Sequence, residues 1–124
     1  MEFFQLFVNL FIAKERRERW FYLSDHPEKL YGKLRQLERH LNTNCRFVEK
    51  QMDDEIEQFI KKHWLSDGYY FSFSPYKDSG YLSAKELENV VAKDYGDFIV
   101  IYPKKKVAIY YHHEGWVWLC EQRS

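Results

Sequence analysis

The fold is decided by the stretch FIVIYPKKKVAIYYHHEGWVWLC, residues 98–120. It holds three apolar runs, at 98–102, 107–111 and 116–120, which are rich in the β-branched and aromatic residues typical of strands. Four residues separate each run from the next. Connections this short join antiparallel neighbours, so the stretch predicts a three-strand antiparallel meander.

The predicted meander has no polar face. In its last strand Trp116, Trp118 and Cys120 point to one side, and Val117 and Leu119 point to the other. A sheet with one face in water alternates apolar and polar residues instead. The pattern leaves two interpretations open: helices cover both faces, or one face carries an exposed aromatic surface that binds a partner.

Upstream of the meander the apolar spacing is mostly helical. The clearest helix is 26–41, where Asp25, Pro27 and Glu28 form a start signal and four leucines follow at helical spacing. Residues 3–12 favour a helix, with a buried strand as the alternative. We also expect a helix over 14–23, an extended segment at 45–48, a helix opening at Asp53, a strand at 69–73 and a helix opening with a capping box at Ser83–Glu86.

These elements predict an α+β fold, in which N-terminal helices pack on a C-terminal antiparallel sheet made of a strand, a helix and the three-strand meander. A chain of 124 residues can form one hydrophobic core. The sequence contains no linker, repeat or low-complexity segment, so we expect a single domain over 1–124.

Composition and charge narrow the class of protein. A hydrophobic fraction of 45% with 31% charged residues predicts a soluble globular protein. The 19 cationic and 19 anionic side chains cancel, whereas proteins that hold a nucleic-acid backbone usually carry a basic excess. We interpret Cys45 and Cys120 as reduced thiols, with a single long-range disulfide as the alternative.

The apolar run at 3–13 is too short to span a membrane, which takes about 20 residues. Gln5 and Asn9 interrupt it, and Glu2 stands where a signal peptide needs a positive charge. The run therefore predicts a buried first element in a cytoplasmic protein without a transmembrane segment. A peripheral membrane anchor is the alternative.

A motif follows this run, Ile12-Ala13-Lys14-Glu15-Arg16-Arg17-Glu18-Arg19-Trp20, and a Leu-Ser pair and a charged helix come after it. It resembles the opening of a family of small uncharacterised bacterial proteins. The second half is similar in order: an extended YYFSFSP, a Ser-Gly turn, the helix SAKELENVV, a strand and a Pro-Lys turn before VAIYY. Residues 69–118 depart from the family in having more aromatics and a plainer Ile-Tyr-Pro turn. The resemblance implies a bacterial cytosolic protein, and it implies no activity because none is known for the family.

The candidates for chemistry are His112, His113 and Glu114, with Cys120 nearby. Adjacent strand residues point to opposite faces, so two neighbouring histidines converge on a metal only if a tight turn redirects them. We interpret the segment as a polar hairpin turn, and we keep an enzyme or metal site at His112, His113 and Glu114 as an alternative.

A second pattern, a metal-dependent nuclease core, is rejected. Asp97 precedes Lys104, but Tyr102 stands where the second carboxylate is required. The sequence has no glycine-rich phosphate loop either, and it predicts no cofactor.

The absence of a catalytic motif and the aromatic sheet together predict a non-enzymatic protein-binding or regulatory module, of the toxin–immunity or inhibitor type. Its partner is another protein or a second copy of the chain. The predicted contact residues are Tyr102, Tyr110, Tyr111, Trp116 and Trp118. The alternative, less favoured by the neutral charge, is an RNA-binding protein that uses exposed tyrosines with Arg16, Arg17, Arg19, Lys104, Lys105 and Lys106.

Overall fold

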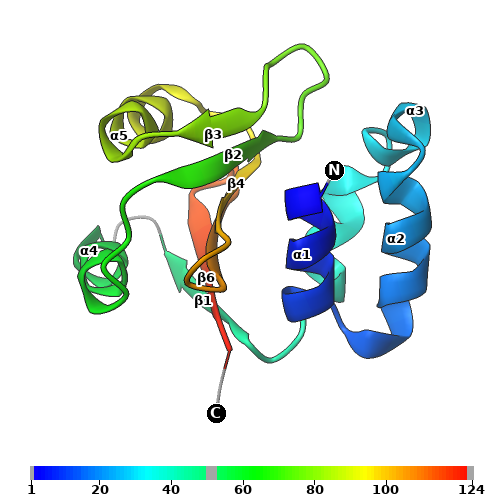
Figure 1. The fold of residues 1–124 in the computed structure, drawn as a ribbon, viewed down its shortest axis with the longest axis horizontal. Coiled ribbons are helices and arrows are strands. Elements are labelled where there is room, and N and C mark those ends of the chain that lie inside the picture. The colour runs from blue at the N-terminus through cyan, green and yellow to red at the C-terminus, as the bar shows by residue number, and fades with distance from the viewer. Residues whose placement is uncertain (1, 50–52, 123–124) are drawn as a thin grey trace.

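The computed structural model describes residues 2–49 and 53–122, and Figure 1 shows their arrangement. Helices and a six-stranded antiparallel sheet form an α+β fold, as predicted. No helix in the described part of the chain is long and apolar enough to cross a membrane. The elements are α1 (Glu2–Phe11), η1 (Lys14–Arg16), α2 (Arg17–Ser24), α3 (Pro27–Leu30), η2 (Leu34–His40), β1 (Cys45–Glu49), α4 (Asp53–Lys62), β2 (Gly68–Ser72), β3 (Gly80–Leu82), α5 (Ala84–Lys93), β4 (Phe98–Tyr102), β5 (Val107–Tyr111) and β6 (Trp116–Glu121).

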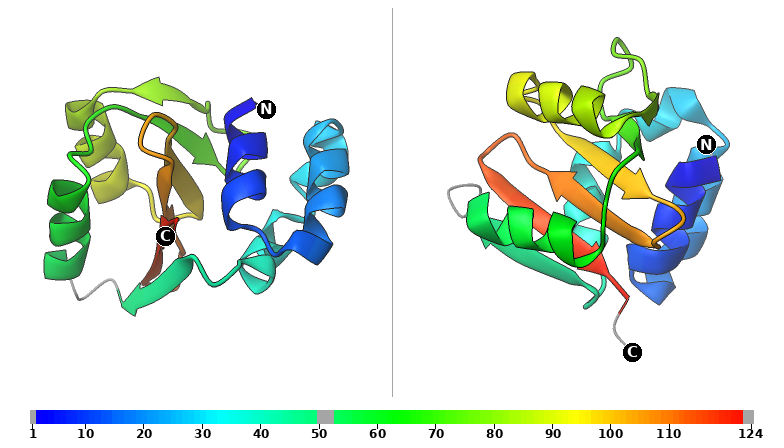
Figure 2. Two further views of the ribbon diagram at one scale, coloured as in Figure 1. Left: turned by 60° about the horizontal axis from the view of Figure 1, so that its bottom comes forward. Right: turned by 60° about the vertical axis from the view of Figure 1, so that its left-hand side comes forward.

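The strand order in the sheet is β1-β6-β5-β4-β2-β3, and every neighbouring pair is antiparallel. The predicted meander β4–β5–β6 is confirmed. Figure 2 shows β1 beside β6 at one margin of the sheet. Strand β3 was not expected from the sequence. It has only three residues, between a turn and a capped helix, and these are too few to show the alternation of a strand.

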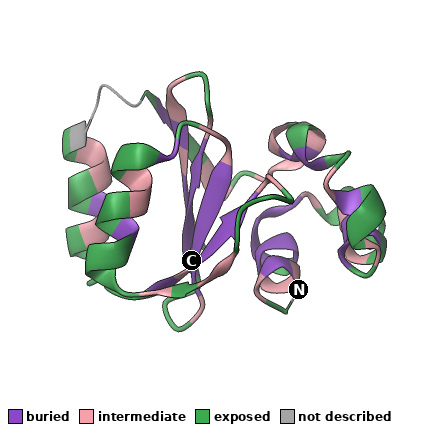
Figure 3. Cartoon of the chain, turned by 90° about the horizontal axis from the view of Figure 1, so that it is seen from above, coloured by how far each residue is buried: buried purple, intermediate pink, exposed green. Residues whose placement is uncertain are grey.

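Helices cover both faces of the sheet (Figures 1 and 3). Helices α1, α2 and η2 lie on one face, where Phe7, Trp20 and Leu37 are fully buried. Helices α4 and α5 lie on the other, where Phe59 and Leu87 are buried. The meander is therefore apolar on both sides because both sides are packed, which answers the question that its sequence left open.

This packing buries most of the residues predicted to bind a partner. Tyr102, Tyr110 and Tyr111 are 7%, 0% and 7% exposed. The prediction that these three tyrosines form a contact surface is wrong, since the helices take them out of water. Trp116 and Trp118 are only half-buried, and they remain candidates.

The local signals for helices are confirmed at two places. The first segment forms the helix α1 and not a strand. The capping box of α5 is present: Ser83 Oγ accepts a hydrogen bond from Glu86 N–H at 3.2 Å, and the Glu86 carboxylate accepts one from Ser83 N–H at 3.1 Å. Both signals depend only on residues a few positions apart.

The helix predicted over 26–41 is wrong beyond its first turn. Helix α3 ends at Leu30, a turn follows at 31–33, and η2 continues as a 3₁₀ helix. Gly32 lies in that turn, and glycine costs about 1 kcal/mol relative to alanine inside a helix. The break therefore occurs where the helix is intrinsically weakest.

The 3₁₀ geometry of η2 has a packing reason. Three residues per turn place Leu34, Leu37 and His40 on one side of the helix. The two leucines are buried, and His40 Nδ1 accepts a hydrogen bond from the indole N–H of Trp20 at 2.9 Å. The regular α-helix expected from the leucine spacing would not align His40 with both leucines.

The bond from Trp20 requires an unprotonated Nδ1 on His40. Burial lowers the pKa of His40 below its ordinary 6.5, and the positive charges of Arg16, Arg19 and Arg39 lower it further. The fold therefore favours the neutral imidazole.

His40 makes the stability pH-dependent. Because its folded pKa is lower than its unfolded pKa of 6.5, the unfolded chain binds more protons as the pH falls through this region. The stabilisation is complete above pH 6.5 and is lost as the pH falls toward the folded pKa. We expect His40→Gln, whose amide oxygen can still accept from Trp20, to weaken this pH dependence in urea titrations between pH 7.5 and 5. An equally steep dependence in the variant would contradict this assignment.

Candidate functional site

The β5–β6 turn carries the histidines singled out in the sequence. His112 N–H donates to Trp116 O at 3.0 Å, and Gly115 N–H donates to His112 O at 3.1 Å. Gly115 has φ +93°, the left-handed conformation that a three-residue hairpin loop requires at this position. The interpretation of this segment as a hairpin turn is confirmed.

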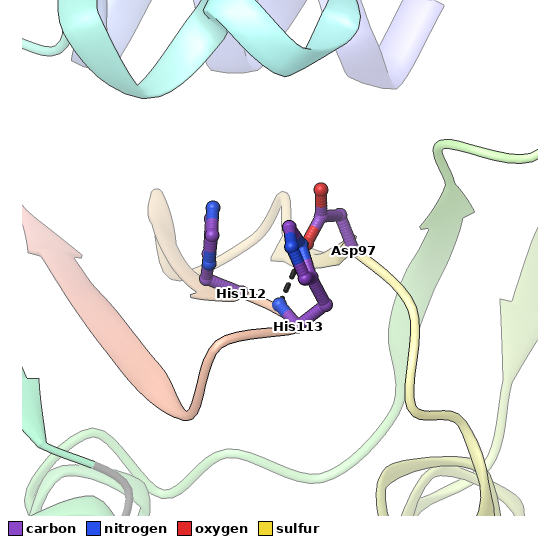
Figure 4. Close-up of side chains that lie close together, drawn as sticks. All are labelled: Asp97, His112 and His113. Atoms are coloured by element: carbon purple, nitrogen blue, oxygen red, sulfur yellow. Dashed lines mark hydrogen bonds and ion pairs between the residues drawn. The ribbon is translucent and has the colours of Figure 1, made fainter.

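The turn brings the two histidine rings together. Their centroids are 4.4 Å apart with planes 27° from parallel, and Figure 4 shows the rings side by side. His112 also stacks on Trp116, at 4.3 Å and 16°. The tight turn that convergence required is present, since both histidines lie beyond Tyr111, the last residue of β5.

Asp97, just before β4, completes this cluster. Its Oδ1 accepts hydrogen bonds from the His113 backbone N–H at 2.7 Å and from His113 Nδ1 at 2.8 Å (Figure 4). Sequence reasoning considered Asp97 only as a nuclease residue and missed this role. The hairpin itself carried the signal: Phe98 pairs with Tyr111, so the residue before one strand lies beside the residues after the other.

His112 is held by one group of its own turn and by one from a distant segment. Its Nδ1 accepts a hydrogen bond from Glu114 N–H at 3.1 Å, and its Nε2 lies 3.6 Å from a carboxylate oxygen of Glu38 in η2. The other oxygen of Glu38 accepts from Trp116 Nε1 at 3.2 Å. The carboxylate beside His112 is therefore Glu38, while the Glu114 side chain lies 3.7 Å from His113 Nε2 and is largely exposed.

The aromatic contacts continue from this turn to the outermost strand. Phe47 of β1 contacts Trp118 at 5.4 Å and Trp116 at 6.1 Å between ring centroids. With the stacks already described, five rings contact one another in sequence, and we call them the ring row: Trp118, Phe47, Trp116, His112 and His113. Sequence reasoning missed Phe47 because nothing in the sequence pairs β1 with β6.

The ring row is partly open to solvent. Phe47 is 48% exposed, and the His113 side chain is 52% exposed. Trp116 and Trp118 are half-buried beside them. Phe47 thus presents a large, half-exposed apolar ring at the margin of the sheet.

The cluster at the end of the row has metal-binding chemistry. Asp97, His112 and His113 each offer one ligand atom, and these atoms lie within 4.8 Å of one another. Imidazole nitrogens with one carboxylate suit Zn²⁺ and related transition metals. With Glu38 beside Nε2 of His112, a metal would take Nδ1, which would have to release its hydrogen bond from Glu114 N–H. Glu114 is not part of this set.

Cysteine–histidine catalysis has no support in the geometry. Cys120 is fully buried, and burial raises the pKa of its thiol. A reactive cysteine needs the opposite, a lowered pKa and access to substrate. Both Cys120 and its cross-strand neighbour Cys45 are free thiols.

The basic residues predicted for nucleic-acid binding lie on separate elements. Lys104, Lys105 and Lys106 are exposed in the β4–β5 turn. Arg16 and Arg19 are exposed on η1 and α2, whereas Arg17 Nε donates to the backbone oxygen of Ile12 at 2.9 Å, a bond that stabilises the start of α2.

A second polar cluster, around Asp94 at the end of α5, is internally satisfied. The Asp94 carboxylate accepts hydrogen bonds from Tyr70 Oη, from Lys77 Nζ at 2.6 Å and from Gly96 N–H at 2.9 Å. Burial raises the pKa of Asp94, but these bonds outweigh it and hold the pKa below its ordinary value. Burial also raises the pKa of Tyr70, to about 12. This cluster fastens α5 to β2 and to the loop after β2.

Comparison with known protein families, with curated proteins and with solved structures finds no match to this chain. The resemblance of residues 12–20 to a bacterial family stays a prediction.

Asp97 is expected to stabilise the turn. Asp97→Ala removes the acceptor of two hydrogen bonds from His113, which we expect to lower the free energy of unfolding by about 1 to 2 kcal/mol. Urea denaturation measures this loss. Asp78→Ala removes an exposed carboxylate from the β2–β3 loop and should change stability by less than about 0.5 kcal/mol. Equal effects of the two substitutions would contradict the role given to Asp97.

Proposed function

We propose that this protein is a non-enzymatic protein-binding module, of the inhibitor or immunity type, and that the ring row is its contact surface. The observation that carries the proposal is the exposed ring of Phe47 among half-buried tryptophans. Aromatic residues are enriched in protein interfaces and supply many of their strongest contacts. A half-exposed cluster of such rings gains stability when a partner removes it from water.

The backbone of β1, next to the ring row, can also contact a protein partner. Strand β1 has a strand neighbour on one side only within the described sheet, so its outer margin can pair with an added strand. An extended protein segment on β1 would form backbone hydrogen bonds there and place side chains near Phe47. We therefore expect the partner to be a protein that presents an extended segment.

The proposed location is cytoplasmic, where the two facing cysteines would stay reduced. Cys45 lies directly across from Cys120. In the neighbouring pair, Asn44 and Glu121, Glu121 N–H donates to Asn44 O at 3.1 Å. Hydrogen-bonded and non-hydrogen-bonded pairs alternate along antiparallel strands, so the two cysteines form a non-hydrogen-bonded pair, in which the side chains are closer together. Thiols placed this way remain free in a reducing compartment.

A tagged pull-down from host lysate tests the proposal. The wild-type chain should retain a stoichiometric protein partner after nuclease treatment. Phe47→Asp places a charge in the ring row at a half-exposed position outside the buried cores, and it should weaken this partner's binding at least about tenfold. Titration calorimetry with the purified partner measures the change.

Tyr76→Asp supplies the control for that experiment. Tyr76 is 95% exposed in the loop between β2 and β3, so its replacement changes the same charge and removes a similar ring elsewhere. Binding should stay within about twofold of wild type. Capture of no stoichiometric protein, or an unchanged affinity in Phe47→Asp, would show that the ring row is not the contact surface.

A second candidate function, metal binding, is favoured by the close approach of ligand atoms in Asp97, His112 and His113. We expect one Zn²⁺ per chain near pH 7.5, with affinity falling at lower pH because protons compete for the imidazoles. Calorimetry with ZnCl₂ measures the stoichiometry. His113→Ala should remove the binding, while His26→Ala, which removes a histidine from the α2–α3 connection, should retain it. Equal zinc uptake by both variants would exclude this site.

A further inference from the structure

Trp64 occupies a backbone position that ordinarily belongs to glycine. Its φ is +53°, at the end of α4. Leu65 N–H donates to Ile60 O at 3.0 Å, the hydrogen bond that closes a Schellman ending. The left-handed residue of this motif is usually glycine, because a Cβ there crowds the backbone. A bulky tryptophan is therefore held at a cost in stability.

Packing does not explain why a tryptophan stands there. The Trp64 side chain is 83% exposed, so its ring contributes little to either hydrophobic core. Strained residues that persist without a structural gain are found at binding sites, where the strained conformation presents a side chain to a ligand. The exposed ring of Trp64 borders a hollow of about 240 Å³.

Three distant segments meet at this hollow: the end of α4, strand β3 and the β4–β5 turn. Tyr81 of β3 is 49% exposed, but its ring also contacts Phe3 of α1, at 6.0 Å between centroids, so Trp64 supplies the free aromatic face. Lys104 and Lys105 are exposed in the turn. No ion pair in the described part of the chain engages either lysine. The hollow is lined by Trp64, Leu65, Ser66, Asp67, Tyr81, Tyr102, Lys104 and Lys105.

This combination of side chains selects a ligand class. Aromatic faces bind planar rings by stacking, and free ammonium groups bind phosphate. Asp67 would repel a phosphate placed beside it, but its carboxylate can accept a hydrogen bond from an exocyclic amine. The volume is below the range of about 300–1,000 Å³ that accommodates drug-sized ligands, so the hollow suits one flat ring system such as a nucleobase, with a charged group beyond it at the exposed lysines.

We infer that this hollow binds an amine-bearing nucleotide, with the base against Trp64 and the phosphate near Lys104 and Lys105. The nucleotide is either free or one unit of a single-stranded nucleic acid. The site is independent of the ring row, so it adds a second binding activity to the proposed function.

Two probes separate the sources of the nucleotide. Calorimetry with AMP tests the free ligand, and fluorescence anisotropy with a labelled eight-nucleotide oligo(A) RNA tests the strand. We expect at least one to bind at micromolar concentration. Binding of AMP alone identifies a nucleotide site, and markedly tighter binding of the RNA identifies a single-strand site. Failure of both probes to bind below about 1 mM would overturn the inference.

Trp64→Gly is the decisive variant, because it should strengthen the fold while removing the ring. We expect its melting temperature to rise by roughly 4 °C and its affinity for the probe to fall at least about tenfold. Trp64→Phe keeps an aromatic face at the same position and should bind within about threefold of wild type. Tyr95→Gly removes another exposed ring and should leave binding unchanged. Wild-type affinity in Trp64→Gly would overturn the inference.

Charge is tested with paired substitutions. Lys104→Glu with Lys105→Glu should weaken RNA binding and reduce the slope of log affinity against log salt by about 1 to 1.5. Lys14→Glu with Lys33→Glu makes the same change in net charge at exposed lysines on other elements. An equal loss of RNA affinity in both double variants would show non-specific electrostatic attraction and would contradict binding at this hollow. Phe47→Asp should leave nucleotide binding unchanged, which distinguishes failure of this site from failure of the ring row.

Discussion

The structure depends on a central meander that is apolar on both faces. Strands β4 and β5 are buried along their whole length, and a sheet of this kind cannot leave either face in water. The N-terminal helices pack on one face, and α4 and α5 pack on the other. The positions of the helices follow from this requirement, and so does the burial of the tyrosines along β4 and β5.

The margins of the sheet are where this coverage ends, and both candidate sites lie there. At the β1–β6 margin the helices leave Phe47 and parts of two tryptophans in contact with solvent. At the β3 side, Tyr81 and the lysines of the β4–β5 turn border the hollow beside Trp64. Functional side chains thus occupy positions that the cores do not need, and the central strands supply a rigid support for them.

The connection between α5 and β4 has a larger structural role than its length indicates. Asp94 at its start accepts hydrogen bonds from Tyr70 and Lys77, and Asp97 at its end accepts two from His113. These carboxylates join three segments that are distant in the sequence: the connection itself, β2 with the loop after it, and the β5–β6 turn. Because each accepts more than one hydrogen bond, the connection is fixed at both ends, and the β5–β6 turn is fixed with it.

The sequence by itself determined the elements that depend on near neighbours. The meander follows from β-branched and aromatic runs with four-residue connections, and the capping box at Ser83 follows from a residue three positions away. The alternation of side chains along β6 was also predictable, because a strand has a period of two. Of the candidate sites, the sequence identified His112, His113 and the lysine turn, since these are contiguous motifs.

Only the tertiary structure decided the strand pairing, the 3₁₀ helix and the exposure of the aromatic rings, because these features depend on which distant surfaces are buried together. The pairing of β1 with β6 placed Phe47 in the ring row. Residues 34–40 form a 3₁₀ helix, in which His40 accepts a hydrogen bond from Trp20, whereas the leucine spacing indicated an α-helix. The left-handed Trp64 contradicts its local propensity, so no local rule predicts it. Competition for burial among distant segments also decided which aromatic rings remained exposed.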